Sequence, residues 1–299
     1  MSKTSKALLA VFCGNTIFGF SFLATRLILD KTSVFVLLSV RFLFAFLIMN
    51  LLVLFGLFRL NFKGKPLFKV ILLGIAQPIV YFICESYGIA LTNSSFSGTL
   101  IAMVPIFAIF FAAAFIREKF SLSQLLWGLC AVIGVIIISL GSPDGTPVTT
   151  LGVLLLVIAV ASGAMFNVLS RITSKDFSAF ERTYIMFALA SVVFTLLALI
   201  ETGGKLPFIL SELFIDPYFT LPVIFLSLFS SVIAFTLLNY ATTYIAVRQS
   251  SIFSCWTTVV SIIAGIMILH EPFGGIRQVV GSLLILAGVY MVSIANTDK

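Results

Sequence analysis

Residues 117–128 read REKFSLSQLLWG, and residues 270–281 read HEPFGGIRQVVG. The two stretches share Glu, Phe and Gly at the same three places and stand at one constant shift from each other. Apolar matches mean little in a chain so rich in Phe, Ile and Leu, whereas a matched acid and a matched glycine between apolar runs are informative. The two stretches therefore indicate that one part of the chain repeats another.

The same shift aligns residues 85–140 with residues 238–293 without a gap. Beyond the stretches already quoted, the matched polar residues are Tyr87 with Tyr240 and Ser97 with Ser250. The clearest break between the copies is GSPDGTP at residues 141–147, whose Pro and Gly content interrupts helices. We therefore predict a first repeat at residues 1–141, a linker at residues 142–147 and a second repeat at residues 148–299.

The composition indicates whether the chain folds in water or in a lipid membrane. The 299 residues are 61% hydrophobic and only 10% charged. A soluble domain carries about 25% charged residues, so this chain lacks the charge to cover a water-facing surface. Backbone groups in lipid must be satisfied within helices or closed barrels, and long unbroken apolar runs are typical of helices. The composition predicts an all-α integral membrane protein.

The apolar runs divide into ten segments at about 20 residues per crossing. They are predicted near residues 7–28, 33–58, 67–91, 95–116, 122–141, 149–170, 180–200, 217–242, 248–269 and 275–295. Five crossings per repeat is an odd number, so the second repeat enters the membrane from the opposite side. The predicted fold is about ten transmembrane helices in two inverted five-helix repeats, a recurring design of secondary transporters. The connection at 201–217 is expected to be plain, with a short interfacial helix at 209–214 as the alternative.

The basic residues are distributed unevenly between the two sides of the predicted membrane. Most fall on the side of the N-terminus, namely Lys3, Lys6, Arg59, Lys63, Lys65, Lys69, Arg117, Lys119, Arg171, Lys175, Arg182, Arg248 and Lys299. Because Lys and Arg concentrate in cytoplasmic loops, both termini are predicted to be cytoplasmic in a multi-pass protein of the cell (inner or plasma) membrane. Topology and anionic headgroups explain the net charge of +7, so we predict no nucleic-acid partner.

Glu85 is the most informative ionisable residue of the apolar segments. It lies inside the third segment, about six residues from the predicted outer end. An ionisable group in hydrocarbon is costly and is retained for a partner, a cavity or a proton. Tyr81 and Gln77 precede Glu85 by four and eight residues, so the three polar groups share one face of a regular helix. Pro78 removes one backbone hydrogen bond and predicts a kink beside Gln77.

Arg41 lies at a similar depth in the second segment, and two interpretations of it stay open. In the first, Arg41 and Glu85 form a structural ion pair that makes both tolerable in the membrane. In the second, Glu85 alternately binds a proton or a cationic substrate group, and Arg41 acts as its competitor or gate. Glu85 aligns with Leu238 in the second copy. A charge present in only one copy favours a substrate site over a packing device.

Polar and aromatic residues in other segments complete the candidate site. Asn15 and Asn167 lie near the middle of the first helix of each repeat, and a buried amide must be hydrogen-bonded. Each therefore either connects helices or lines a cavity. Tyr240 and Tyr244 share one face of the eighth segment, and Trp256 lies in the ninth. Such aromatic residues are more often core than site, but their polar tips need partners.

No pattern in the chain predicts enzymatic chemistry, a metal or a cofactor. Glu118 and Glu271 each precede a helix, where a carboxylate satisfies free N–H groups and complements the helix dipole. The single histidine, His270, cannot form a multi-histidine metal site. The four cysteines lie in apolar segments without CxxC spacing and are expected to act as small buried hydrophobes. A GxxxxGK[ST] phosphate-binding loop is absent.

The pattern resembles the drug/metabolite transporter superfamily with two EamA-like domains, over nearly the whole chain. Its most specific pieces are the two quoted domain ends and the small-residue stretches SSFSG at 94–98 and AVRQS at 246–250. The resemblance implies ten transmembrane helices, a central cavity between the halves and movement of small metabolites by alternating access. Many members export amino acids or related compounds. Glu85 is not part of the family pattern, so its role rests on this sequence alone.

We therefore predict a secondary transporter of a small metabolite and favour an amino-acid exporter, with proton coupling as an option. Substrate is expected near the bilayer midplane, at Asn15, Tyr81, Glu85, Asn167, Tyr240, Tyr244 and Trp256. The first alternative is transport of drugs, nucleosides or S-adenosylmethionine-like cationic metabolites, because a carboxylate suits a cationic substrate. A lipid-modifying membrane enzyme is a remote alternative, because such an enzyme normally clusters His, Asp or Glu at the interface.

Overall fold

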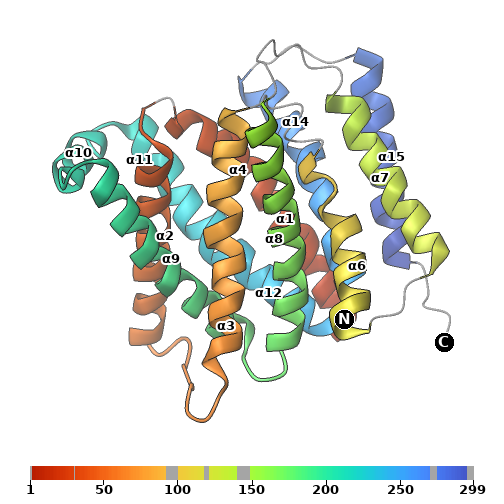
Figure 1. Cartoon of the computed structure of the whole chain (residues 1–299), viewed down its shortest axis with the longest axis horizontal. Coiled ribbons are helices and arrows are strands. Elements are labelled where there is room, and N and C mark those ends of the chain that lie inside the picture. Colours follow the sequence, from red (N-terminus) through yellow and green to blue (C-terminus); the bar gives the residue numbers. More distant parts are fainter. Residues whose placement is uncertain are drawn as a thin grey trace.

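A computed structural model describes residues 2–29, 31–91, 100–117, 121–139, 149–269 and 275–294. Every regular element in these ranges is a helix, and the helices form one bundle (Figure 1). The chain is an all-α membrane protein of roughly ten helices, as the sequence predicts. The linker predicted at residues 142–147 lies outside the described residues, as does Ser97.

The helix bounds follow the predicted apolar segments closely. The first half contains α1 (Lys3–Leu29), α2 (Val34–Leu54), α3 (Leu67–Gly74), η1 (Ile75–Val80), α4 (Tyr81–Ala90), α6 (Val104–Ile116) and α7 (Leu122–Ser139). The second half contains α8 (Thr150–Thr173), α9 (Ala179–Glu201), α10 (Leu206–Leu213), α11 (Pro217–Ile224), η2 (Phe225–Ile233), α12 (Ala234–Tyr244), α13 (Val247–Ile252), α14 (Ser254–Leu269) and α15 (Gly275–Ile294). Among the described residues, six segments are long and apolar enough to cross a membrane. Two of the six are composite, because α3, η1 and α4 form one segment and α11, η2 and α12 form another.

Polar side chains at the helix starts satisfy backbone N–H groups that have no partner within the helix. Ser178 and Glu181 form a capping box at the start of α9, in which each side chain accepts from the other's backbone N–H. Ser121 and Gln124 exchange the same two bonds at the start of α7. The sequence had suggested carboxylates for this role, but Glu118 and Glu271 lie outside the described residues, together with His270.

The two ends of the chain lie on the same side of the bundle. α1 begins and α15 ends at the bottom of Figure 1, which we call the N-terminal side. The α2–α3 and α8–α9 connections also lie there, and α10 lies on the opposite side. An even number of crossings gives this arrangement.

α10 corrects the expectation that the connection at 201–217 is plain. Residues Leu206–Leu213 form a helix that starts with Pro207 in its first turn. Leu206 is buried against Val36 and Ala198, while Phe208 is exposed. The connection is helical because apolar residues on one face of α10 pack against α2 and α9, while those on the other face point outward.

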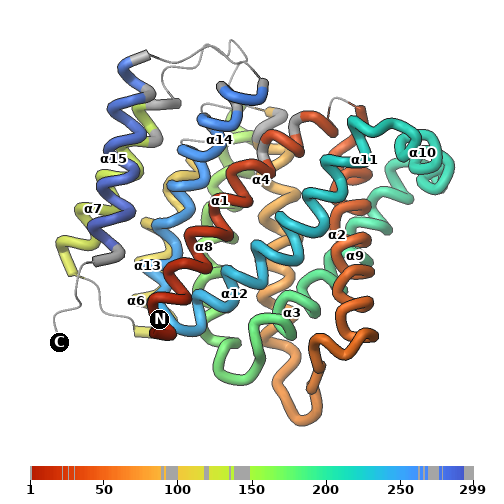
Figure 2. Tube along the Cα trace, turned by 180° about the vertical axis from the view of Figure 1, so that it is seen from behind, coloured from red at the N-terminus to blue at the C-terminus, as the bar shows by residue number. Residues whose placement is uncertain are grey.

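The pattern of contacts between helices is symmetric with respect to the two halves of the chain. The most extensive contacts join α7 with α15, α2 with α9, α1 with α12, α1 with α14, α4 with α8, and α6 with α8. Exchanging each helix with its counterpart in the other repeat maps every one of these contacts onto another member of the set or onto itself. Figure 2 shows one half of this pattern, in which α1 runs between α12 and α14. A two-fold relation between the halves would produce this set of contacts.

The two composite segments occupy equivalent places in the halves, and each contains a π-helical stretch, η1 or η2. Gln77 has non-helical backbone angles (φ −145°, ψ 127°), so the kink predicted beside Pro78 is confirmed. The Ser162 hydroxyl of α8 donates to the Ala76 carbonyl at 2.6 Å, which satisfies backbone at the break. The kink also corrects the prediction that Gln77 continues the helix face of Tyr81 and Glu85.

Small residues let α7 and α15 pack closely. A Cβ atom at Gly134 would stand 2.6 Å from the carbonyl oxygen of Gly281, and one at Gly288 would stand 2.7 Å from the Cβ of Ala131. Real Cβ atoms do not approach so closely, so these glycines are required for packing.

Replacing Gly134 by Ala is expected to separate α7 from α15 and destabilise the protein by about 1–3 kcal/mol. Thermal unfolding of the purified protein in detergent measures the change. Gly128→Ala is the matched control on the same helix, because a Cβ there would meet only the Cδ1 of Ile252 at 3.6 Å. Equal unfolding temperatures for the two variants would contradict the packing account.

Ion pairs tie the halves together on both sides of the bundle. On the N-terminal side, Lys65 pairs with Glu181 at 2.8 Å. On the opposite side, Lys31 pairs with Asp216. The hydrogen bond from Lys31 lowers the pKa of the exposed Asp216 carboxyl below its ordinary value. The first pair joins the α2–α3 connection to the start of α9, and the second joins the α1–α2 connection to the start of α11.

Candidate functional site

Glu85 and Tyr81 form a buried polar pair on α4. The Tyr81 hydroxyl donates to Oε1 of Glu85 at 2.9 Å, and Glu85 is only 7% exposed. Their spacing of four residues brings the two side chains to one face, as predicted. Gly163 of α8 makes room for this pair, because a Cβ there would lie 3.1 Å from the Tyr81 ring. The contact between α4 and α8 therefore positions the pair.

Arg41 of α2 is buried nearby without a direct ion pair to Glu85. Its Nε donates to the Ser231 hydroxyl at 3.0 Å, and its Nη2 donates to the Ser230 hydroxyl at 2.8 Å. The guanidinium also stands over the ring of Phe82, 4.9 Å from its centre. Among the described residues no ion pair joins Arg41 to Glu85, although the two charges interact through space. The interpretation in which the two residues form a direct structural pair is therefore corrected.

The reason for this correction lies in the second half of the chain. Ser230 and Ser231 belong to η2, the π-helical stretch that packs against α2. Their hydroxyls accept hydrogen bonds from the guanidinium, so the direct partners of Arg41 are neutral oxygen atoms and not the carboxylate of Glu85. Sequence reasoning considered only the nearest opposite charge and did not pair Arg41 with residues about 190 positions away.

Asn15 joins two helices. Its Nδ2 donates to the Val11 carbonyl at 2.8 Å, and its Oδ1 accepts from the Thr257 hydroxyl of α14 at 3.1 Å. Trp256 strengthens the same contact by donating from Nε1 to the Thr16 hydroxyl at 3.0 Å. Of the two interpretations of Asn15, contact between helices is the one that these bonds support.

Asn167 occupies the equivalent place on α8 but has different surroundings. Its Nδ2 donates to the Gly163 carbonyl at 3.0 Å, the same local bond that Asn15 makes. Asn167 is half-buried, and its Oδ1 has no partner among the described residues. The free oxygen leaves Asn167 able to contact a solute. Gly163 connects Asn167 to the Tyr81–Glu85 pair, because Gly163 also contacts the Tyr81 ring.

Tyr240 and Tyr244 lie at the end of α12 rather than at mid-depth. Their ring centres are 4.9 Å apart. Both line a hollow of about 400 Å³ with residues 174–179 of the α8–α9 connection, on the N-terminal side. The Lys3 ammonium stands 5.7 Å from the centre of the Tyr244 ring. The sequence predicts that these tyrosines contact substrate near the midplane, and the structure places them in the last two turns of α12, which ends at Tyr244.

Arg182 is a buried residue that sequence reasoning did not single out. Its side chain is fully buried. Nη1 donates to the carbonyl and the hydroxyl of Ser170, and Nη2 donates to the Asn239 carbonyl and the Thr243 hydroxyl. These oxygens lie near the C-terminal ends of α8 and α12, where the helix dipoles favour a cation. Arg182 therefore connects α8, α9 and α12. From the sequence alone, Arg182 is only one of the basic residues predicted on the N-terminal side.

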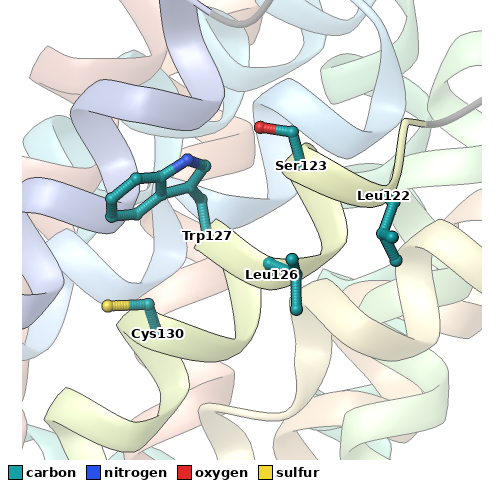
Figure 3. A pocket seen from close by; sticks show the side chains of 5 residues that line it. All are labelled: Leu122, Ser123, Leu126, Trp127 and Cys130. Carbon is teal, nitrogen blue, oxygen red and sulfur yellow. The ribbon is translucent and has the colours of Figure 1, made fainter.

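An apolar hollow on α7 is separate in character from these polar groups. It has a volume of about 400 Å³ and is lined by Leu122, Ser123, Leu126, Trp127 and Cys130 (Figure 3). None of the predicted site residues lines it. Among the described residues no group of three His, Cys, Asp or Glu side chains could hold a metal ion.

The chain is similar in sequence to one family of transporters and similar in fold to a solved structure. The sequence profile of the EamA-like transporter family matches residues 5–140 and 150–294. An uncharacterized transporter of Bacillus subtilis, YcxC, is 30% identical, and the match covers 99% of this chain and 95% of YcxC. A second uncharacterized transporter of the same organism, YetK, is 26% identical over 98% of this chain and 88% of its own length. A solved crystal structure at 17% identity superposes with a TM-score of 0.79 over 96% of each chain, which shows the same fold.

Proposed function

Because the chain belongs to the EamA-like transporter family, it is a membrane transporter, and we propose that it moves a small metabolite by alternating access. The route runs between two five-helix halves of opposite orientation. The exchange of helix contacts between the halves supports this arrangement. The two family matches also fall on the two predicted repeats. We place the protein in the cell membrane with cytoplasmic termini, on the basis of the uneven distribution of Lys and Arg.

The observation that carries the proposal is the buried Glu85. A carboxylate in a membrane-spanning helix is costly, and its described partner is one tyrosine hydroxyl. We assign Glu85 as the group that takes up a proton or a cationic group of the substrate, and Asn167 as a second contact. Arg41 is assigned to the same site from the facing helix.

The favoured substrate is an amino acid, moved outward from the cell. The presence of both a carboxylate and a guanidinium in one region supports a small solute that carries both charges. A cationic metabolite such as an S-adenosylmethionine-like compound, a drug or a nucleoside is the second candidate. The specific observation in its favour is that Glu85, unlike Arg41, makes only one hydrogen bond to the protein.

Flux through the purified protein in proteoliposomes tests the proposal. Labelled amino acids, nucleosides and S-adenosylmethionine are offered with and without a pH gradient. We expect amino-acid flux well above that of protein-free liposomes, with a change in rate when the gradient is applied. Flux of nucleosides or S-adenosylmethionine alone would transfer the assignment to the second candidate. Flux of no compound in the panel would overturn the proposed function.

A further inference from the structure

The buried guanidinium of Arg41 has hydrogen-bonding capacity to spare. Arg41 is 4% exposed, and a guanidinium carries five N–H donors. Its Nε and one N–H of Nη2 reach serine hydroxyls. The other donors have no acceptor among the residues that the structure describes. A planar guanidinium with two adjacent free N–H groups presents the geometry that binds a carboxylate through two parallel bonds.

The carboxylate of Glu85 is also only partly used. Oε1 accepts the Tyr81 hydroxyl, and within the described ranges Oε2 receives no donor. Glu85 is 7% exposed, so water gives it little compensation. Buried polar groups are normally satisfied, and a partly satisfied buried charge needs an explanation such as a ligand that comes and goes. Glu85 and Arg41 are therefore oppositely charged, buried groups whose hydrogen-bonding capacity is only partly used by the described residues.

Arg41 and Glu85 lie near each other, but among the described residues they form no direct ion pair. The guanidinium stands over the ring of Phe82, and Glu85 follows Phe82 by three residues, a rise of about 4.5 Å along the helix. Phe82 also makes an edge contact with Tyr81, the partner of Glu85. Ser230 and Ser231 hold Arg41 from η2, and Tyr81 holds Glu85 from its own helix. The groups that contact Arg41 and Glu85 directly are neutral, and within the described part of the chain each of the two is the opposite charge that the other senses through space.

We propose that Arg41 and Glu85 together form a binding site for the zwitterionic end of one α-amino acid, with Arg41 binding the carboxylate and Glu85 the ammonium. The two charges of an α-amino acid are separated by a single carbon atom, which suits two protein charges that do not touch. The aromatic ring of Phe82 beside Arg41 suits an apolar side chain. This inference rests on the proposed function and names the atoms that would select its substrate.

Binding of matched compounds to the full-length protein in detergent tests the site. The probes are leucine, 3-methylbutylamine, which lacks the carboxylate, and 4-methylpentanoate, which lacks the ammonium. Phenylalanine, phenethylamine and 3-phenylpropionate form a second series with an aromatic side chain. Thermal stabilisation at rising concentration gives an apparent affinity for each. We expect each amino acid to bind at least about tenfold more tightly than both of its analogues, because each lost charge removes a charge-assisted hydrogen bond.

Two variants separate the contributions of the two residues. Arg41→Gln is expected to remove the advantage of leucine over 3-methylbutylamine and to keep its advantage over 4-methylpentanoate. Glu85→Gln is expected to do the reverse. The unfolding temperature without ligand controls for folding. If Arg41→Gln does not fold, Arg41→Lys replaces it and is expected to weaken amino-acid binding while leaving leucine preferred over 3-methylbutylamine.

Three outcomes would overturn the zwitterion site. They are equal binding of an amino acid and one of its analogues to the wild type, the same loss of preference in both variants, and binding of none of the six compounds. The flux panel separates these failures from failure of the proposed function. Flux of any solute in that panel without the predicted binding pattern would leave a transporter that selects its substrate elsewhere. Absence of all flux would remove the proposed function itself.

Discussion

Replacing Glu85 by Gln is expected to abolish transport, or to remove its dependence on pH, while the amount of folded protein in the membrane stays near the wild-type level. Gln has nearly the same volume and can still accept the Tyr81 hydroxyl, so the local packing is preserved. It cannot hold a negative charge or take up a proton. The variant therefore separates the charge of Glu85 from its structural contacts.

Flux in proteoliposomes across a series of pH values measures this effect, and quantitative detection in membranes measures abundance. Tyr81→Phe is the companion variant, because it removes the hydrogen bond at 2.9 Å and keeps the acid. It is expected to retain transport with a shifted pH dependence. Glu181→Gln is the control, because Glu181 is bound by Lys65 on the N-terminal side. Unchanged transport and unchanged pH dependence in Glu85→Gln would make Glu85 a structural residue.

Replacing Arg182 by Leu is expected to cause the largest loss of stability of any single change considered. The fully buried guanidinium satisfies oxygens of Ser170, Asn239 and Thr243. Without it, each of these buried oxygens loses one donor, and a buried polar group left unsatisfied costs about 1–3 kcal/mol. The expected loss is on the order of 3 kcal/mol or more. Much of the protein should then fail to accumulate in the membrane.

Thermal unfolding in detergent and membrane abundance measure the loss. Arg182→Lys keeps the charge but not the forked geometry and is expected to fall between the wild type and Arg182→Leu. Lys175→Ala, on the exposed α8–α9 connection nearby, is expected to change neither readout. Stability of Arg182→Leu equal to that of Lys175→Ala would show that the network does not hold α8, α9 and α12 together.

The helices could be predicted from the sequence because their cause is local. A run of about 20 apolar residues specifies a crossing helix wherever it stands, since lipid leaves the backbone no other partner. α10 escaped this criterion because its eight residues are too few to cross, and its formation depends on docking of Leu206 against Val36 and Ala198. The kink at Gln77 could be predicted from Pro78, which lies inside η1, whereas η2 itself contains no proline.

The candidate site could be predicted only where its contacts lie within one helix. Tyr81 and Glu85 stand four residues apart, so periodicity alone brings them together. The partners of Arg41 come from η2, far away in sequence, and depend on how the two halves pack. Asn15 and Asn167 look equivalent in the sequence, yet the oxygen of Asn15 accepts from Thr257, whereas the oxygen of Asn167 has no donor within the described ranges. Such differences arise from tertiary packing and carry no local signal.

The most direct test of the route between the halves is the accessibility of position 167 from each side of the membrane. The protein is prepared as Asn167→Cys after replacement of its native cysteines, which are Cys13, Cys84, Cys130 and Cys255. A membrane-impermeant thiol reagent is then added to one side of oriented vesicles at a time. Alternating access predicts modification from both sides and protection by a transported solute. Modification from one side only, or from neither side, would contradict the account.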